Sequence, residues 1–463
     1  MKIKTLLLLV GCFLLLPSMA NAQFMTAIST EEAPVLTPEV LAMALAESTD
    51  SFSVVLGSAS TEINTVGAVN TDPRQIGVFQ GGNTAEGTFL PLENQNAAGL
   101  ATYEGGIGID SGICISTGLL SDSEENSDDG RGVGIEGPNN GIGSTFNAGE
   151  VSFSFEVFTG TGFFTPSDFD FVENVLRAGG GDAGVLEFQI ELNKPGFLRL
   201  SHVYATDEFP FFSLAEFNDS FGVLIRQDSI PEAEFKNIVQ LRTPGLPPEP
   251  FTLEALQRCS LFLENQIAPA PATLLGSSHA IDDPTTPFYD HEFAGFSAVM
   301  TSETDSALAP GVYTIKIVIQ DVIDTLIDSA VFLEADSLKL FDLENGDFNA
   351  DGVVDVLGDV SILSTNFGMT SASFADGDAN GDGVVDGSDV AIVIANLGAT
   401  GNADFSADFN RDGMVTFQGD VGTIANNIGL TSCASRADGD ADRDGDVDLA
   451  DVSIFIEQLN FGR

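Results

Sequence analysis

Aspartate and asparagine recur at alternate positions in four short segments near the C-terminal end of this 463-residue chain. The segments begin at Asp347, Asp378, Asp408 and Asp440, which are 31, 30 and 32 residues apart. Each segment has oxygen-bearing side chains at its first, third and fifth positions and glycine at its sixth. Calcium is a hard cation that takes about six to eight oxygen ligands, and the alternate side chains of a tight loop can surround one ion. The repeat therefore predicts four calcium-binding loops.

The second and fourth segments match the spacing of a loop of about 12 residues. In such a loop the glycine permits a sharp turn, the seventh residue offers its backbone carbonyl, and a carboxylate at the last position closes the ligand shell. The predicted ligands are Asp378, Asn380, Asp382, the carbonyl of Val384, Asp386 and Asp389 in the second loop, and Asp440, Asp442, Asp444, the carbonyl of Asp446, Asp448 and Asp451 in the fourth.

The first and third segments are one residue longer, so their closing carboxylates fall at position 13. The extra residue either bulges outward and leaves the ligand in place, or it weakens the site. Thr416 also stands at position 9 of the third segment, where the other three have an acid. We therefore rank the second and fourth loops above the first, and the third last. The predicted ligands are Asp347, Asn349, Asp351, the carbonyl of Val353, Asp355 and Asp359 in the first loop, and Asp408, Asn410, Asp412, the carbonyl of Met414 and Asp420 in the third.

A repeat rich in aspartate and glycine can also be a set of solvated turns, but these four segments share a constant downstream pattern. Apolar residues follow each closing carboxylate at spacings of three and four, which predicts one stripe of a short helix. Glycines at 368, 398 and 429 then mark the ends of the first three helices. The stripes are Val360, Leu363 and Phe367; Val390, Val393 and Leu397; Val421, Ile424 and Ile428; and Val452, Phe455 and Leu459.

These loop–helix units resemble the dockerin family, in which two units pack into one calcium-stabilised module that docks onto a cohesin domain. The resemblance implies two modules here, at residues 345–398 and 404–463. Positions 10 and 11 of the second and fourth loops hold Gly387-Ser388 and Leu449-Ala450, in place of the Ser-Thr pair of many cellulosomal dockerins. The implied protein partner is therefore a cohesin-like or an unconventional docking domain.

The region from residue 51 to residue 340 has a different pattern. Alternating apolar residues fill Val151–Phe158, Leu186–Leu192 and Tyr313–Ile319, and turn-forming residues separate such runs. We expect a mostly β protein, with an antiparallel β-sandwich or jelly-roll-like domain followed by small α-helical, dockerin-like calcium loop–helix repeats. Short helices are also expected at residues 34–47, within an N-terminal segment 23–50, and at residues 252–266.

Three stretches of this region are distinctive together, and they lie at Gly105–Gly118, His202–Ile225 and Tyr313–Leu338. Together they resemble the choice-of-anchor L domain. That family occurs in bacterial exported proteins that differ mainly in the attachment signal at their C-terminus, and it has no established activity. The resemblance therefore implies location and architecture more than chemistry, with the calcium loops in the place of the attachment signal.

The first 22 residues have the pattern of a signal peptide. Two lysines precede the apolar run Leu6–Leu16, and Ala20-Asn21-Ala22 offers a cleavage site after Ala22. An alternative is lipoprotein processing at Leu9–Cys12. No later stretch is apolar enough to span a membrane, so the protein is expected outside the cell or at its surface.

The net charge of −52 disfavours binding to nucleic acid and anionic lipid and favours binding of divalent cations.

No catalytic or organic-cofactor site is predicted. The three histidines lack metal-ligand spacing, no Gly-x-Ser-x-Gly elbow is present, and acidic pairs have no diagnostic weight among 69 Asp and Glu. We expect a non-catalytic protein that attaches or docks through its tail. The alternative is a dockerin-bearing polysaccharide-degrading enzyme or glycan-binding protein, and a surface glycan stays a candidate ligand, although the chain has no Trp and four Tyr.

Two features of the large region stay open at this stage. One acidic cluster contains Asp207, Glu208, Asn218 and Asp219 and another contains Asp321, Asp324 and Asp328; each either belongs to a further metal site or caps turns. Among the cysteines of the exported chain, either Cys114 and Cys259 form a disulfide, or these two and Cys433 are free thiols.

Overall fold

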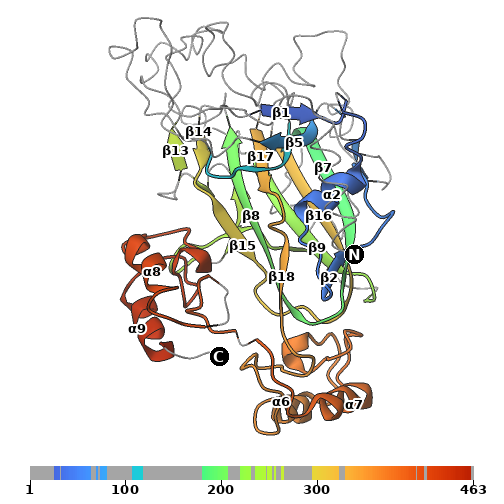
Figure 1. Ribbon diagram of the computed structural model, residues 1–463, viewed down its shortest axis with the longest axis vertical. Coiled ribbons are helices and arrows are strands. Elements are labelled where there is room, and N and C mark those ends of the chain that lie inside the picture. Colours follow the sequence, from blue (N-terminus) through green and yellow to red (C-terminus); the bar gives the residue numbers. More distant parts are fainter. Residues whose placement is uncertain are drawn as a thin grey trace, which may run out of the picture.

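Two antiparallel sheets form the body of the protein in the computed structural model (Figure 1). The structure describes residues 26–31, 33–63, 69–70, 73, 75–80, 107–117, 180–206, 219–230, 235–246, 248–252, 255–256, 262–264, 295–322, 329–402, 404–410 and 414–459. The predicted signal peptide, the lipoprotein box and the predicted strand at 151–158 lie outside these residues.

The first sheet is organised around one long strand, β8. One end of β8 pairs with β17 and β14, and its other end pairs with β15 and β18. The strand order is β1-β5-β6-β17-β8-β14-β13, with β15 and β18 also paired to β8. The bounds are β1 Thr26–Ser29, β5 Ile76–Gln80, β6 Ser111–Ser116, β8 Gly196–Thr206, β13 Phe262–Glu264, β14 Gly295–Ser297, β15 Met300–Glu303, β17 Ser329–Glu334 and β18 Lys339–Asp342.

The second sheet has β16 at its centre, between β9 and β7. Its order is β11-β12-β9-β16-β7-β2, and the short β10 also pairs with β9. A separate two-stranded sheet joins β3 and β4. The bounds are β2 Phe52–Val54, β3 Glu62–Ile63, β4 Val69–Asn70, β7 Gly180–Leu192, β9 Ser220–Gln227, β10 Lys236–Asn237, β11 Gln240–Leu241, β12 Glu249–Thr252 and β16 Gly311–Val322.

Alternating side chains of the two sheets meet in one apolar core. On β7, Leu186, Phe188 and Ile190 are buried, and they share this core with Ile113 of the first sheet. The predicted runs 186–192 and 313–319 lie in β7 and β16, which pair directly, with Leu186 opposite Ile317. Period-two burial on facing sheets is typical of a sandwich. The expected mostly β, antiparallel fold is confirmed.

A short helix, α2 (Pro38–Leu45), covers part of this core within the predicted range 34–47. The Oγ1 atom of Thr37 accepts a hydrogen bond from the backbone N–H of Val40 at 3.4 Å and so caps the helix. Leu41 and Leu45 are fully buried against the sheets.

The helix expected at residues 252–266 is wrong at its C-terminal end. At its start, the Oγ1 of Thr252 accepts from the backbone N–H of Ala255 at 3.2 Å, and residues 255–256 are helical. Residues Phe262–Glu264, however, form strand β13, which pairs with β14. Pairing to a distant strand overrides the local preference here, and it cannot be seen in a short window of sequence.

Phe332 lies on β17 in a second buried cluster, with its ring centroid 5.1 Å from that of Phe79. Replacing it with alanine should lower the free energy of unfolding by about 3–5 kcal/mol, because a large cavity would be left in a packed cluster. Urea denaturation of the full chain would measure this loss. Leu56→Ala, at a side chain that is 76% exposed, is the control and should change stability by less than about 0.5 kcal/mol. Equal effects of the two variants would contradict the prediction.

The described residues of the C-terminal part form four short α-helices and two apolar cores. The first core joins Phe348, Leu363, Phe374 and Val393, and the second is built from residues 405–459. Figure 1 shows α6 and α7 at the lower end of the two sheets and α8 and α9 beside them. The bounds are α6 Asp359–Asn366, α7 Gly387–Asn396, α8 Val421–Asn427 and α9 Leu449–Gln458, with single 3₁₀ turns η6 at Phe374–Asp376 and η7 at Arg436–Asp438.

The predicted apolar stripes are buried at their middle positions, Leu363, Val393, Ile424 and Phe455. The last residues of the first three stripes, Phe367, Leu397 and Ile428, are instead exposed. Each of these residues caps the C-terminus of its helix and has non-helical backbone angles, so its side chain leaves the buried face. Among the described residues, no helix combines the length and the hydropathy that a membrane span needs.

Candidate metal centres

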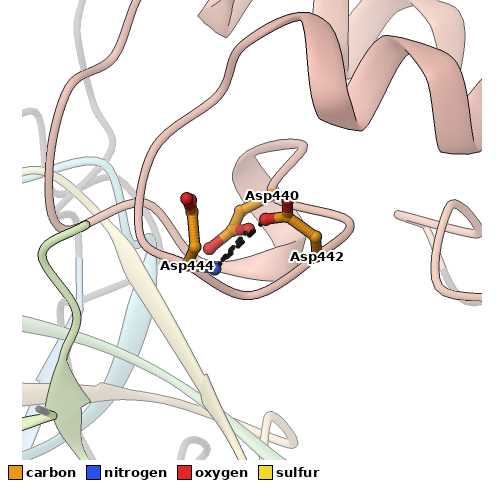
Figure 2. A group of neighbouring side chains, drawn as sticks. All are labelled: Asp440, Asp442 and Asp444. Carbon is orange, nitrogen blue, oxygen red and sulfur yellow. Dashed lines mark hydrogen bonds between the residues drawn. The ribbon is translucent and has the colours of Figure 1, made fainter. Parts of the chain in front are cut away.

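The fourth loop brings its acidic side chains together. Asp440, Asp442 and Asp444 each offer a carboxylate oxygen, and these oxygens lie within 4.8 Å of one another. Figure 2 shows the three side chains gathered in one turn of the chain, where the backbone N–H of Asp444 donates to the Oδ1 atoms of Asp440 and Asp442 at 3.2 and 3.3 Å. Asp446, Asp448 and Asp451 form a second such group in the same loop.

The closing carboxylate has the same backbone partners in the 12-residue loops. In the fourth loop, the Oδ1 of Asp451 accepts from the N–H of Ala441 at 2.7 Å, and its Oδ2 accepts from the N–H of Asp448 at 2.7 Å. In the second loop, Asp389 accepts from Ala379 and Asp386 at 2.9 and 2.8 Å. These partners are positions 2 and 9 of the loop in both cases.

The 13-residue loops repeat this arrangement. Asp359 accepts from the N–H groups of Phe348 and Asp355 at 2.7 Å each, and Asp420 accepts from Phe409 and Thr416 at 2.9 and 2.8 Å. The closing carboxylate therefore keeps its place despite the extra residue.

The extra residue of the first loop is accommodated on the outside. Leu357, at position 11, is 87% exposed, and Val356 before it is also exposed. Of the two alternatives that the sequence left open, the outward bulge is the arrangement seen.

The first position of each loop is buried. In the first loop, Asp347 is enclosed and accepts hydrogen bonds from the N–H groups of Asp351 and Gly352 at 3.1 and 2.9 Å. Burial, with a smaller effect of neighbouring carboxylates, raises the pKa values of Asp347 and Asp440 to about 7. Burying clustered carboxylates is costly unless a positive charge compensates them, and a cation would supply that charge.

The donor set fits calcium. It consists of carboxylate, amide and carbonyl oxygens on a tight loop, which are hard ligands in the number that this ion takes. The glycine at position 6 has positive φ in three loops, at Gly352, Gly383 and Gly445 (87°, 83° and 99°), where a side chain would strain the turn. In the third loop, Asp408 is buried, whereas Asp412 lies outside the described residues. When bound, calcium would supply positive charge at these oxygens and fix the loop.

Of the acidic cluster near residue 219, the structure describes only Asp219, and this residue has a structural role. Asp219 is 1% exposed, and its Oδ2 accepts from the Oγ of Ser329 at 2.6 Å. Ser329 in turn accepts from the hydroxyl of Tyr204 at 3.0 Å. Asp219 thus belongs to a buried hydrogen-bond network, and the remaining acidic side chains of both clusters lie outside what the structure describes.

His202 is a core residue. It is fully buried, its Nε2 lies 2.9 Å from the Oγ of Ser302, and its ring packs edge-on against Phe221 and Phe251. Burial lowers its pKa to about 3, so the imidazole is neutral. His279 and His291 lie outside the described residues.

Neither of the two cysteine arrangements considered from the sequence is correct. Cys114 is a free, buried thiol, and burial raises its pKa. Cys114 therefore does not form the disulfide with Cys259 that was considered from the sequence. Cys433 is disulfide-bonded, with its partner outside the described residues, so it is not a free thiol.

Comparison with known families agrees with both resemblances. The model of the choice-of-anchor L domain matches residues 83–339, more than half of the chain, and that of the dockerin type I domain matches residues 376–419. The second match spans the second loop and most of the third, while the two apolar cores of the tail pair the first loop with the second and the third with the fourth. No curated protein and no solved structure matches the chain. The chain belongs to the choice-of-anchor L domain family and carries a dockerin type I domain in its C-terminal part.

Proposed function

We propose that this is an exported, non-catalytic protein whose β-sandwich is attached to a partner through its calcium-ordered tail. Dockerin-bearing proteins are extracellular, and the domain implies a cohesin partner and calcium binding. The role of the choice-of-anchor L domain is uncharacterised, so the tail carries the functional argument.

The supporting observation is a set of exposed apolar side chains at positions 10 and 11 of the loops. Leu357 of the first loop, Phe417 of the third and Leu449 of the fourth are 87%, 66% and 72% exposed. These are the positions where many cellulosomal dockerins have their Ser-Thr pair. Large apolar groups gain free energy when a partner removes them from water. We therefore infer that the tail binds an apolar face of a cohesin-like domain.

The first test measures binding of the full chain to a panel of cohesin domains in the presence of calcium. Replacing Leu357, Phe417 and Leu449 together with serine should weaken binding at least tenfold, because interface anchors typically contribute more than about 1 kcal/mol each. Leu56→Ser, an exposed apolar position on the sandwich, is the matched control and should bind as the wild type does. Equal affinity of the triple variant and the control would contradict docking through these side chains.

A second test separates docking from a spacer role. The full chain and a form without residues 345–463 are produced in calcium-containing medium, and cells and medium are fractionated. We expect the full chain to stay in the fraction that contains the partner, and the shortened form to be absent from that fraction. Identical distributions would mean that the tail is a rigid calcium-dependent spacer.

An assay against a panel of polysaccharides tests the non-catalytic proposal. Turnover of any member of the panel would contradict it.

A further inference from the structure

Position 4 of the second loop projects toward the sandwich. The backbone of Gly381 has φ +70°, and its carbonyl accepts hydrogen bonds from the Nε2 of Gln227 at 2.7 Å and from the Oγ of Ser229 at 3.1 Å. A Cβ atom at Gly381 would lie 2.7 Å from the carbonyl oxygen of Pro310, which leaves no room for a side chain. This loop is therefore in close contact with the end of β9 and with the turn that precedes β16.

Position 4 of the fourth loop makes the equivalent contact by a side chain. Arg443 has φ +61°, and its guanidinium donates to the carboxylate of Glu303 and to the carbonyl of Asp305 at 3.1 Å each. In the same module, the backbone N–H of Cys433 donates to the carbonyl of Arg242 at 2.7 Å. Residues 303–310, which join β15 to β16, thus touch the fourth loop at one end and the second loop at the other.

The remaining contacts distinguish the two modules. The apolar core of the first module includes Phe197, Ala307 and Ala309 of the sandwich. The second module has a separate apolar core and adds only Cys433 to the core of the sandwich, and its buried Arg436, beside Asp404, also lies 4.0 Å from Glu303. Both Arg436 and Arg443 lie at this surface, in a chain that has only 17 Lys and Arg against 69 acidic residues.

The first loop shows that position 4 is not always used in this way. Ala350 holds that position with φ +55°, and its carbonyl accepts from the backbone N–H of Asp404, the first residue of the second module, at 2.8 Å. A Cβ atom at this position and this φ is therefore compatible with the loop itself. The steric demand at Gly381 comes from the sandwich and not from the loop.

We propose that calcium binding and seating of the tail on the sandwich are one coupled equilibrium, with residues 303–310 as the shared seat. The inference rests on the calcium binding proposed for these loops. Calcium would hold the side chains at positions 3 and 5 in place. Position 4 lies between them, so the ion would also hold position 4 in the conformation in which it contacts the sandwich. By linkage, the sandwich then raises the calcium affinity of the second and fourth loops, because each event stabilises the same loop conformation.

The test uses the full chain and calcium alone as the ligand. Gly381→Ala should lower the calcium affinity of one site at least fivefold, the lower end of typical coupling between sites, as measured by isothermal titration. Gln227→Ala combined with Ser229→Ala should have the same effect without touching the loop. Gly387→Ala adds the same methyl group to the same loop, in open space and at a helical residue, and should bind calcium as the wild type does.

Hydrogen exchange gives the second measurement. Chelation should increase exchange at residues 303–310, which belong to the sandwich and contain no predicted calcium ligand. Unchanged exchange there, or wild-type affinity in both interface variants, would overturn the coupling while calcium binding itself stood. If the wild-type chain bound no calcium at all, the proposed calcium sites would fail together with the coupling.

Discussion

Removing calcium should unfold residues 345–463 while the sandwich stays folded. Without the ion, the buried carboxylates of Asp347 and Asp440 lie beside other carboxylates that repel them. The helices are also short, at seven to ten residues, whereas isolated helices need about 12–15 residues to be even marginally stable. The two small apolar cores of the tail offset little of this cost.

Far-UV circular dichroism of the full chain should lose its helical component in chelator and regain it when calcium is added in excess. Magnesium at the same concentration is the control, because it demands near-octahedral geometry and gives up its water reluctantly. A spectrum that is the same with calcium and with chelator would contradict the prediction.

Replacing the aspartate at position 1 should weaken calcium binding more in the second and fourth loops than in the third. Asp378→Ala and Asp440→Ala should each lower the calcium affinity of their loop by at least about 100-fold, since even outer-shell partners of a metal are worth about 10–100-fold. Asp408→Ala should have a much smaller effect on total calcium binding. The third loop has Thr416 where the others have a carboxylate, so its site is expected to be weak before the substitution.

Isothermal titration of the full-length variants would show the difference as a lost tight site in the first two and an almost unchanged isotherm in the third. Asp50→Ala, at an exposed acid just before β2, controls for the general loss of one negative charge. Equal losses in all three loop variants would mean that the third loop binds as well as the others.

The tail could be predicted from the sequence because its determinants are local. The spacing of oxygen ligands and glycine is contained within about a dozen residues, and the helices that follow begin within two residues of Asp359, Asp389, Asp420 and Asp451. The equivalence of the 12- and 13-residue loops was not predictable in the same way. It depends on which backbone N–H groups the closing carboxylate reaches, and spacing alone does not give that.

The large domain was predictable only as a class. Alternation identified β7 and β16, yet the same local evidence placed a helix over Phe262, which belongs to a strand because β14 lies beside it. Likewise, Cys114 was considered for a disulfide from its residue type and export, whereas its burial in β6 depends on the whole sheet. The seat of the tail at residues 303–310 is of this kind too, because its contacts with Gly381 and Arg443 join residues more than 70 positions apart.

The short connection between sheet and tail limits how far the sandwich can move relative to the tail. β18 ends at Asp342, Leu343 is already buried, and Asp347 is the first predicted ligand, so fewer than five residues separate the strand from the first loop. A flexible linker of 20 residues would let the domain sample distances of roughly 25 Å. This protein has no such freedom at that junction, and Asn402 further holds the carbonyl of Asp342 at 2.9 Å. If the tail docks as proposed, a row of partner domains would hold copies of the sandwich in one orientation and at one spacing, as an ordered array rather than a diffuse layer.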